Sequence, residues 1–338
     1  MENDGKTETG REMVGDFPVR TEEIGFSHAD LIACTKCSKL NSPQRGACLY
    51  CGSELAAEAN RDAAKHEAHG PLEEWEIGYN VAITHAPDSG SLPTATNLLG
   101  LEAEVTELLA NGRLPAARVD TEASAMRILE NLNKVGVEGV IVADEHLRME
   151  TPNIRLRGLE FRSDSVLFLP FNDAAPVSVP TSEITLVVTG MIVERSSETI
   201  EKRKKGSIEV LDEKFSQSDE GLIDVYARKG PVGYRIRSHG FDFSCLGGDK
   251  SMLAGQNMER LFVKLGEEFP NADTNALYGT VRPLLNIVWP IEDRRESLGF
   301  QRIGRLGRKE LAHAQRSSNR TQFDRFSRLQ YALYEREV

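Results

Sequence analysis

Four of the five cysteines stand in two closely spaced pairs near the start of the chain. Two residues separate Cys34 from Cys37, ten residues follow, and Cys48 and Cys51 repeat the spacing just before Gly52. Each pair makes a tight knuckle that aims two sulfurs at one point, and two knuckles supply the four thiolates of a tetrahedral zinc site. The spacing therefore predicts one structural Zn²⁺ held by Cys34, Cys37, Cys48 and Cys51.

A redox pair or an iron centre is the alternative for the same cysteines. A redox enzyme needs only one such pair, at the start of a helix in an α/β fold. The segment between the pairs, SKLNSPQRGA, is turn-like and too short for that arrangement. A site with four sulfur ligands has no open coordination position, so we expect a structural role and not Lewis-acid catalysis.

Nucleic-acid binding is a second use of such a module, and it requires basic side chains for the phosphates. Residues 28–58 hold three basic and three acidic side chains, which leave no net positive face. They are Lys36, Lys39, Arg45, Asp30, Glu54 and Glu58. The balance favours a structural or protein-docking role for the module.

Other groups that could take part in chemistry fit structural roles better than catalytic or metal-binding ones. His66 and His69 in KHEAH are one residue short of the HExxH zinc-protease spacing, which indicates a solvated linker. The segment HGFDFSCLGG brings together His239, Asp242, Ser244 and Cys245 but lacks GxSxG, and its large apolar residues predict a buried strand with an inert Cys245. The run EKRKKGS at 201–207 is expected to be a solvated loop.

The whole composition describes a soluble chain of several domains. It has 338 residues, 40% hydrophobic and 28% charged, with a net charge of −11 that disfavours nonspecific nucleic-acid binding. The polar N-terminus shows no export signal, and the cysteine usage fits a reducing compartment, so we expect a cytoplasmic protein. No catalytic constellation is recognisable, so catalysis is not expected. Because the negative net charge disfavours nucleic acid, protein is the expected partner.

Charge is unevenly distributed along the chain. From Arg294 to the end there are eleven Lys and Arg against five Asp and Glu, a local charge of +6 beside −17 for the remainder. Asn319-Arg-Thr-Gln322 is spaced as a capping box for a helix in which Phe323 and Phe326 interleave with Arg325 and Arg328. A basic amphipathic helix of this kind docks on its own body or on a partner.

Hydrophobic periodicity divides the chain into six segments, which together predict an α+β multidomain fold. They are a disordered N-terminal arm (1–27), a zinc ribbon (28–55), a linker (56–75), a small βααβαβ-like α/β unit (76–147), a β-rich domain with packed helices (153–290) and a basic tail with an amphipathic helix (291–338). In the β-rich domain, RLRGLEFRSDSVLFLP and GLIDVYARKGPVGYRIRS each predict a hairpin. The charged stretch 196–221 between them is expected to be a loop open to proteases.

Three segments of the α/β unit carry a resemblance to a known fold. LGLEAEVTELLANG, LPAARV and DTEASAMRILENLNKVGVEGVIV resemble the C-terminal domain of the bacterial ribosomal stalk protein and the related protease-adaptor fold. The stalk protein has a lysine-rich helix for factor binding where this chain has APDSGSLPTATN, so the resemblance implies the fold and a habit of binding proteins, not factor binding.

Two wider resemblances cover the rest of the chain. Several antiparallel strands followed by a helix resemble a pleckstrin-homology-like barrel. The combination of knuckles, stalk-like unit and FDFSCLG…NMERL…VWP resembles large uncharacterised bacterial zinc-ribbon proteins. The sequence thus predicts a non-catalytic zinc-binding adaptor or regulatory protein. A nucleic-acid-associated factor using the ribbon and the basic tail is the alternative, and an enzyme with an unrecognised site is the third reading.

Overall fold

The structure is a computed structural model of the chain. It describes residues 13–14, 17–18, 32–34, 36–37, 39–41, 48–53, 72, 76–85, 93, 103–172, 174–204, 207–228, 233–302 and 309–337. Most of the expected disordered arm, nearly all of the linker 56–75, and both His66 and His69 lie outside these residues. Within them, no helix has the length and apolar character to cross a membrane.

The chain divides into two compact units, Met1–His69 and Gly70–Val338. The first unit holds two short antiparallel pairs of strands. One pair is β1 (Met13–Val14) with β2 (Phe17–Pro18), and the other is β3 (Ile32–Ala33) with β4 (Leu40–Asn41). The pair β3–β4 carries the first cysteine knuckle.

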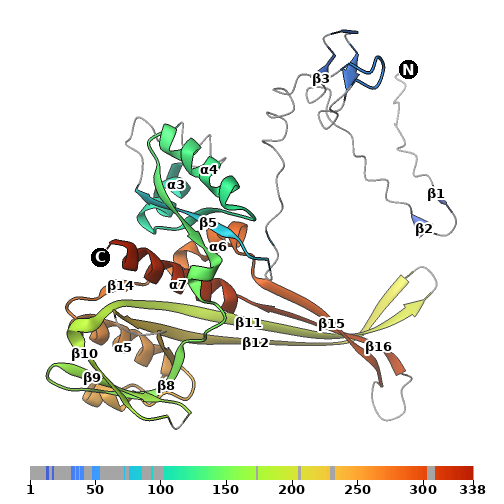
Figure 1. Ribbon diagram of the computed structural model, residues 1–338. Coiled ribbons are helices and arrows are strands. Elements are labelled where there is room, and N and C mark those ends of the chain that lie inside the picture. Colours follow the sequence, from blue (N-terminus) through green and yellow to red (C-terminus); the bar gives the residue numbers. More distant parts are fainter. Residues whose placement is uncertain are drawn as a thin grey trace, which may run out of the picture. The chain divides into compact units, whose positions relative to one another are not determined.

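The second unit begins with a small three-stranded α/β element (Figure 1). Its parts are β5 (Tyr79–His85), α3 (Ala103–Asn111), β6 (Pro115–Val119), α4 (Glu122–Lys134) and β7 (Glu138–Ala143), with sheet order β6-β5-β7. The Thr121 side chain accepts from Ser124 N and caps α4, and Gly136, with φ 77°, follows its end. The predicted order of strands and helices is present in the described part of this segment, and Leu98, where the first of these helices was expected to begin, lies outside the described residues.

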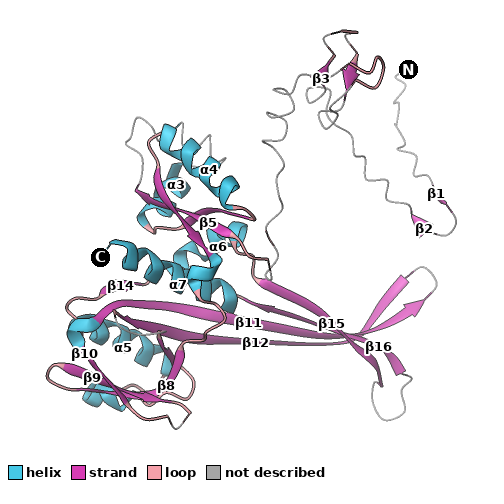
Figure 2. Ribbon diagram, viewed as in Figure 1, coloured by secondary structure: helices cyan, strands magenta, loops and turns pink. Residues whose placement is uncertain are grey.

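A nine-stranded, curled and mostly antiparallel sheet forms the centre of the second unit (Figure 2). Its order is β10-β9-β8-β13-β12-β11-β16-β15, with β14 beside β11. The strands are β8 (Ile154–Phe161), β9 (Ser165–Pro170), β10 (Val177–Pro180), β11 (Ile184–Lys204), β12 (Ser207–Ala227), β13 (Tyr234–Arg237), β14 (Asp273–Asn275), β15 (Glu292–Arg302) and β16 (Lys309–Ser318). The predicted hairpins β8–β9 and β12–β13 are both confirmed.

Alternation along the central strands places apolar residues on both faces of the sheet. Leu186 and Val188 belong to one core, with the α/β element, α6 (Tyr278–Val288) and α7 (Arg320–Glu337). Val187 between them belongs to a second core with β8, β9 and α5 (Ala254–Glu268). Two layers of helices therefore sandwich these strands, which is why β11 and β12 read as continuous apolar runs near Ile184 and Ala227.

The segment 243–249 is a 3₁₀ helix and not the buried strand that its apolar residues predicted. Asp242 accepts from Ser244 N and begins this helix, while Phe243 and Leu246 are buried. Residues spaced by three lie on one face of a 3₁₀ helix, so Phe243 and Leu246 are buried together, whereas in a strand they would point to opposite faces.

The C-terminal segment is not a tail, which corrects the prediction for residues 291–338. Its first part forms the hairpin β15–β16, and α7 lies in the first core with Phe323 and Phe326 fully buried (Figure 1). The expected burial of these two rings is confirmed. Arg325 and Arg328, which interleave with these rings in the sequence, are also buried, at 7% and 8% exposed.

The capping box predicted at the start of α7 is absent, because both side chains are used elsewhere. Asn319 Oδ1 accepts from Val193 N at 2.7 Å, and Asn319 Nδ2 donates to Met191 O at 3.0 Å. Gln322 Nε2 donates to Trp289 O at 2.7 Å. These polar groups fix α7 to β11 and to the end of α6, which a local helix-capping motif would not do.

The stretch 196–221 is also not a loop, because it lies within the long hairpin β11–β12. These strands pair from Ile184↔Ala227 to Lys204↔Ser207, and β16 pairs with β11 from Glu194↔Ser318 to Glu201↔Leu311. With β15 beside β16, four strands continue past the helical cores as a projection (Figure 1). We call residues 195–204, 207–219, 292–302 and 309–318 the four-stranded extension.

Candidate metal centre

The two knuckles of the first unit are built by short backbone hydrogen bonds. Cys34 follows β3, and its N–H donates to Lys39 O at 2.9 Å, closing the first turn. Cys48 N donates to Ser53 O at 2.8 Å, closing the second. Gly52 has φ 70°, a conformation that other residues adopt at a cost, so glycine suits this turn.

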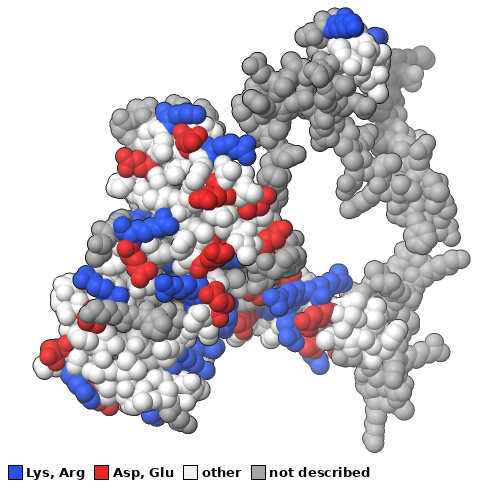
Figure 3. Space-filling model, viewed as in Figure 1, with Lys and Arg blue, Asp and Glu red and all other residues white. Residues whose placement is uncertain are grey.

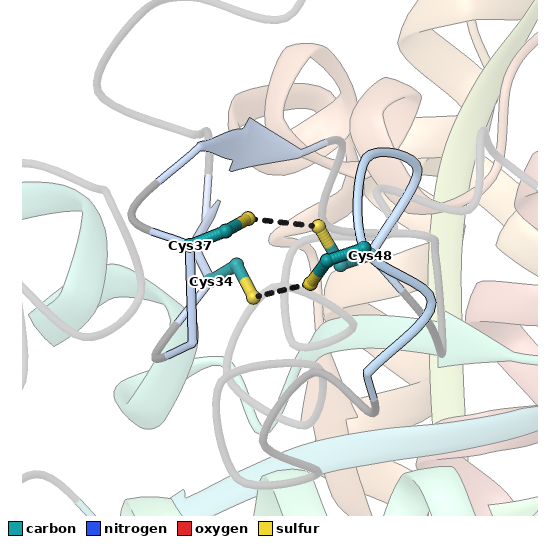
Figure 4. Close-up of side chains that lie close together, drawn as sticks. Cys34, Cys37 and Cys48 are labelled. Atoms are coloured by element: carbon teal, nitrogen blue, oxygen red, sulfur yellow. Dashed lines mark hydrogen bonds between the residues drawn. The ribbon is translucent and has the colours of Figure 1, made fainter.

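All four predicted cysteine ligands converge on one point. Their sulfurs lie within 4.8 Å of one another, with Cys34 Sγ to Cys51 Sγ at 3.6 Å and Cys37 Sγ to Cys48 Sγ at 3.5 Å (Figure 4). A tetrahedral ion with metal–sulfur distances of about 2.3 Å requires sulfurs about 3.8 Å apart. The cluster therefore has the size of a four-thiolate metal site. The four cysteines are free thiols, not disulfides.

Donors from the knuckles point at the sulfurs. Lys36 N donates to Cys34 Sγ and Tyr50 N donates to Cys48 Sγ, each at 3.4 Å. The Ser53 hydroxyl lies 3.2 Å from Cys34 Sγ and 2.9 Å from Cys51 Sγ. Such donors stabilise negative sulfur, as ligand-supporting groups around metal sites do.

Asn41 and Ser53 are supporting residues that the sequence did not reveal. Asn41 is buried; its Nδ2 donates to Cys48 Sγ at 3.5 Å, and its Oδ1 accepts from Leu49 N at 2.9 Å. Asn41 therefore joins the first hairpin to the second knuckle. Neither residue belongs to the cysteine spacing, and the only signal for Ser53 is its position two residues after Cys51.

The pKa values of Cys34 and Cys37 are shifted in opposite directions. The Ser53 hydroxyl and the Lys36 N–H lower the pKa of Cys34 to about 6. The Lys39 N–H lowers the pKa of Cys37, but burial and the neighbouring thiols outweigh it and raise that pKa to about 12. Four adjacent thiolates repel one another, so full ionisation requires a cation between them, which a bound metal supplies.

The second knuckle also presents apolar side chains to solvent. Leu49 and Tyr50 are 61% and 60% exposed, and Lys39 Nζ lies 5.7 Å from the centre of the Tyr50 ring. The described part of the module therefore combines an apolar tip with one nearby cation.

The other candidate residues do not assemble into a hydrolytic site. His239 Nδ1 pairs with Glu220 at 3.4 Å, whereas Ser244 Oγ donates to Asp242 at 2.6 Å. Burial raises the pKa of the half-buried Cys245 to about 11, which keeps its thiol protonated and a poor nucleophile near neutral pH.

Fold and site together define a mixed α/β protein that has a curled, β-rich sheet with few helices and a separate cluster of four cysteines suited to a metal. Comparison with protein-family models, curated proteins and solved structures finds no match to this chain.

Proposed function

We propose that this chain is a non-catalytic zinc-binding adaptor or regulatory protein of the cytoplasm that acts through protein–protein contacts. The observation that carries the proposal is the combination of a closed four-sulfur cluster with an exposed apolar tip. Four thiolates fill the tetrahedral positions of zinc, so the ion holds the two knuckles together and leaves no position for a substrate. The knuckles then serve to display Leu49 and Tyr50.

Zinc is the proposed ion because of its ligands and their arrangement. Soft thiolates in a tetrahedral set suit zinc or iron, and the cytoplasm keeps such thiols reduced. The N–H groups of Lys36 and Tyr50 and the Ser53 hydroxyl offset part of the negative charge on four sulfurs. Much of the folding free energy of so small a module would come from the metal.

Docking of a protein partner on the second knuckle follows from its surface chemistry. An aromatic ring and an adjacent leucine are typical of the centre of a protein interface, where burial of each contributes about 1.5–3 kcal/mol. The two units of the chain form separate compact bodies, so the module and the sheet domain can engage different partners. This is the arrangement expected of an adaptor.

A capture experiment with matched variants tests the proposal. Tagged full-length protein is incubated with lysate, and partners are identified by mass spectrometry for the native chain, for Leu49→Ser/Tyr50→Ser and for Met252→Ser. Met252 is 99% exposed on the other unit and serves as the control. We expect at least one partner to be lost only with the knuckle variant, and then to bind the purified native chain in calorimetry.

Two results would contradict the adaptor proposal. One is that the knuckle variant captures the same proteins as the native chain. The other is turnover of a small molecule by the purified protein, which would support the enzyme reading. The nucleic-acid alternative through the tail helix is weakened by its packing, because Phe323, Phe326 and Arg328 are buried in the second unit.

A further inference from the structure

A cavity of about 320 Å³ opens where the four-stranded extension leaves the helical part of the second unit. Its described walls come from β11, from β16 and the residue after it, from α6, and from the segment that joins α6 to β15. Ligand sites in proteins have volumes of about 300–1,000 Å³. The cavity therefore has the size for a small metabolite, not for a folded partner or a nucleic-acid chain.

The sheet supplies one wall of the cavity. Arg195 of β11 is paired with Ser317 of β16, and two residues earlier on β11, Val193 N donates to Asn319 Oδ1 at 2.7 Å. Side chains two residues apart in a strand point to the same face of the sheet, so Val193 and Arg195 face the cavity together. The buried Asn319 also donates to Met191 O at 3.0 Å. Hydrogen bonds to β11 therefore hold this wall in place.

Helix α6 supplies the second wall. Arg282, Pro283 and Asn286 lie on one side of this helix, because residues three and four apart are neighbours on a helix surface. Asn286 Oδ1 accepts from Ile291 N at 2.9 Å, which places Ile291 in the same wall and leaves the Asn286 Nδ2 group as a donor. Proline inside a helix is costly because it removes a backbone hydrogen bond, and here Pro283 adds apolar surface to the cavity. The wall thus combines apolar surface with two donor side chains.

The charge that borders the cavity has one sign. Its described lining holds two arginines and no Asp or Glu, whereas described acidic and basic side chains intermingle on the face of the second unit shown in Figure 3. Arg195 Nε donates to the neutral Gln217 Oε1 at 3.2 Å, and Arg282 has no hydrogen bond or ion pair with any residue that the structure describes. The carboxylate of Asp293 on β15 accepts from Gln315 Nε2 at 3.0 and 3.1 Å. Neither cavity arginine therefore has a carboxylate partner among the described residues.

We propose that this cavity binds a small organic phosphate. Arg195, Arg282 and Ser317 hold the phosphate group, and the apolar part of the ligand lies against Pro283 and Ile291. Guanidinium groups match phosphate oxygens with paired hydrogen bonds, and two like charges at one cavity repel each other until an anion binds. A phosphomonoester carries a charge of about −1.5 to −2 at pH 7, which two arginines balance, whereas a single carboxylate would neutralise only one of them.

A metal cation and a neutral apolar ligand are the alternatives for a cavity of this size. Mg²⁺ and Ca²⁺ take carboxylate and carbonyl oxygens, and here a cation would meet two guanidinium groups and no carboxylate among the described lining residues. A neutral ligand would leave both arginines without an anionic partner. Binding of an organic phosphate goes beyond the adaptor proposal and is independent of the knuckle surface, which belongs to the other unit.

Isothermal titration calorimetry of the full-length protein with phenyl phosphate tests the proposal, because this probe has one phosphate group and one apolar ring. Inorganic phosphate and phenol are the two partial probes. We expect phenyl phosphate to bind at one site per chain, inorganic phosphate to bind more weakly, and phenol not to bind. Inorganic phosphate should also compete with phenyl phosphate, since both need the same arginines.

Substitutions of the arginines test the anion-binding part of the site. Arg195→Met and Arg282→Met should each weaken phenyl phosphate binding about tenfold or more, because a hydrogen bond to a charged group contributes about that factor. Arg316→Met is the matched control, since it removes one positive charge at an exposed position next to Ser317. Side chains alternate along a strand, so Arg316 belongs to the opposite face of the sheet and does not line the cavity. Solvent and salt screen its charge, so this variant should bind phenyl phosphate within about twofold of the native affinity.

A second pair of variants tests the apolar part of the site. Ile291→Ser should weaken binding of phenyl phosphate about threefold or more and leave binding of inorganic phosphate unchanged, because only the ring gains from apolar burial. Ile287→Ser is the control, since Ile287 is 63% exposed on α6 and does not line the cavity. Leu49→Ser/Tyr50→Ser changes the other unit and should bind phenyl phosphate as the native chain does, so this test and the capture experiment can fail independently.

Three results would overturn the proposal. The first is the absence of phenyl phosphate binding by the native chain at millimolar concentration and low salt. The second is an unchanged affinity in both arginine variants, with circular dichroism showing that they are folded, or an equal loss with Arg316→Met. The third is binding of phenol as tight as that of phenyl phosphate, which would define an apolar site. If neither arginine variant folds, the comparison of the three probes on the native chain decides the matter.

Discussion

Gly190→Ala tests whether α7 packs on β11 as a part of the core. Gly190 lies in β11 opposite Leu222, beneath the aromatic residues of α6 and α7. A Cβ at this position would lie 2.5 Å from Phe323 Cε2 and 2.8 Å from Tyr278 Cδ1. Carbon atoms pack at about 3.5–4.0 Å, so both rings would have to move by about 1 Å.

The surroundings leave the rings little room for that movement. Tyr278 and Phe323 are both fully buried and meet edge to face with centroids 5.0 Å apart. The Tyr278 hydroxyl also donates to Asn319 O at 3.1 Å. Overpacking of a close-packed core costs about 1–3 kcal/mol. For a unit of this size that lowers the melting temperature by about 2–5 °C.

Thermal unfolding followed by circular dichroism measures the effect, and a second substitution checks its cause. Phe323→Leu removes part of the obstructing ring, so the double variant Gly190→Ala/Phe323→Leu should lose less stability than the two single effects added together. Gly279→Ala is the control, because its Cβ meets nothing within 4 Å and helix propensity favours alanine there. A Gly190→Ala protein as stable as the native chain, with additive effects in the cycle, would refute this packing.

The remaining predictions concern charge, the buried arginine and the metal. Ion pairs with Arg237 and Arg320 outweigh burial and lower the pKa of Glu220. The stability that the Glu220 carboxylate adds is therefore present above its unfolded pKa and is lost as pH falls through its folded pKa. In chemical denaturation, Glu220→Gln should be destabilising at pH 7 and progressively less destabilising in acid. Burial raises the pKa of Asp324 despite the neighbouring Arg235, so ionisation of this carboxyl destabilises the folded protein as pH rises. Asp324→Asn should therefore gain stability relative to the native chain between pH 4 and pH 7. Parallel pH profiles for the Glu220 and Asp324 variants would contradict both assignments. Arg328 donates hydrogen bonds to the carbonyls of Leu147, Arg148 and Thr151, so Arg328→Met should lower the free energy of unfolding in urea by about 2–4 kcal/mol. A loss as small as that caused by Arg316→Met, at an exposed position, would show these hydrogen bonds to be unimportant. Chelation of the metal should unfold the cysteine module and leave the main thermal transition unchanged, since the second unit is a separate body; a lowered main transition would show that the units depend on each other.

The sequence predicted best those features that local pattern alone determines. Paired cysteines meet wherever the chain forms two knuckles, so the clustering of Cys34, Cys37, Cys48 and Cys51 followed from their spacing. Thr121 caps the start of α4, and Gly136 with its positive φ follows the end of the helix, so both signals lie within a few residues of the helix ends. Strands such as β8 and β9, with one face on a core, showed the alternation that burial imposes.

The extension escaped prediction because hydrogen bonding, not burial, maintains its strands. Residues 196–221 are mostly polar, and apolar residues among them, such as Val210 and Phe215, are exposed. No hydrophobic period therefore marks the segment, yet β12 and β16 pair with β11 on either side. The same reason hid β15 and β16 within a run that read as a basic tail. Asn319 and Gln322 were misread because their partners, Val193 and Trp289, are distant in sequence.

Zinc-edge X-ray absorption on the purified full-length protein tests the central claim, a four-thiolate zinc centre, most directly. We expect one zinc per chain with four sulfur neighbours at about 2.3 Å and no nitrogen or oxygen ligand. Protein prepared without chelator that contains iron in place of zinc, or no metal and a disulfide among Cys34, Cys37, Cys48 and Cys51, would contradict it.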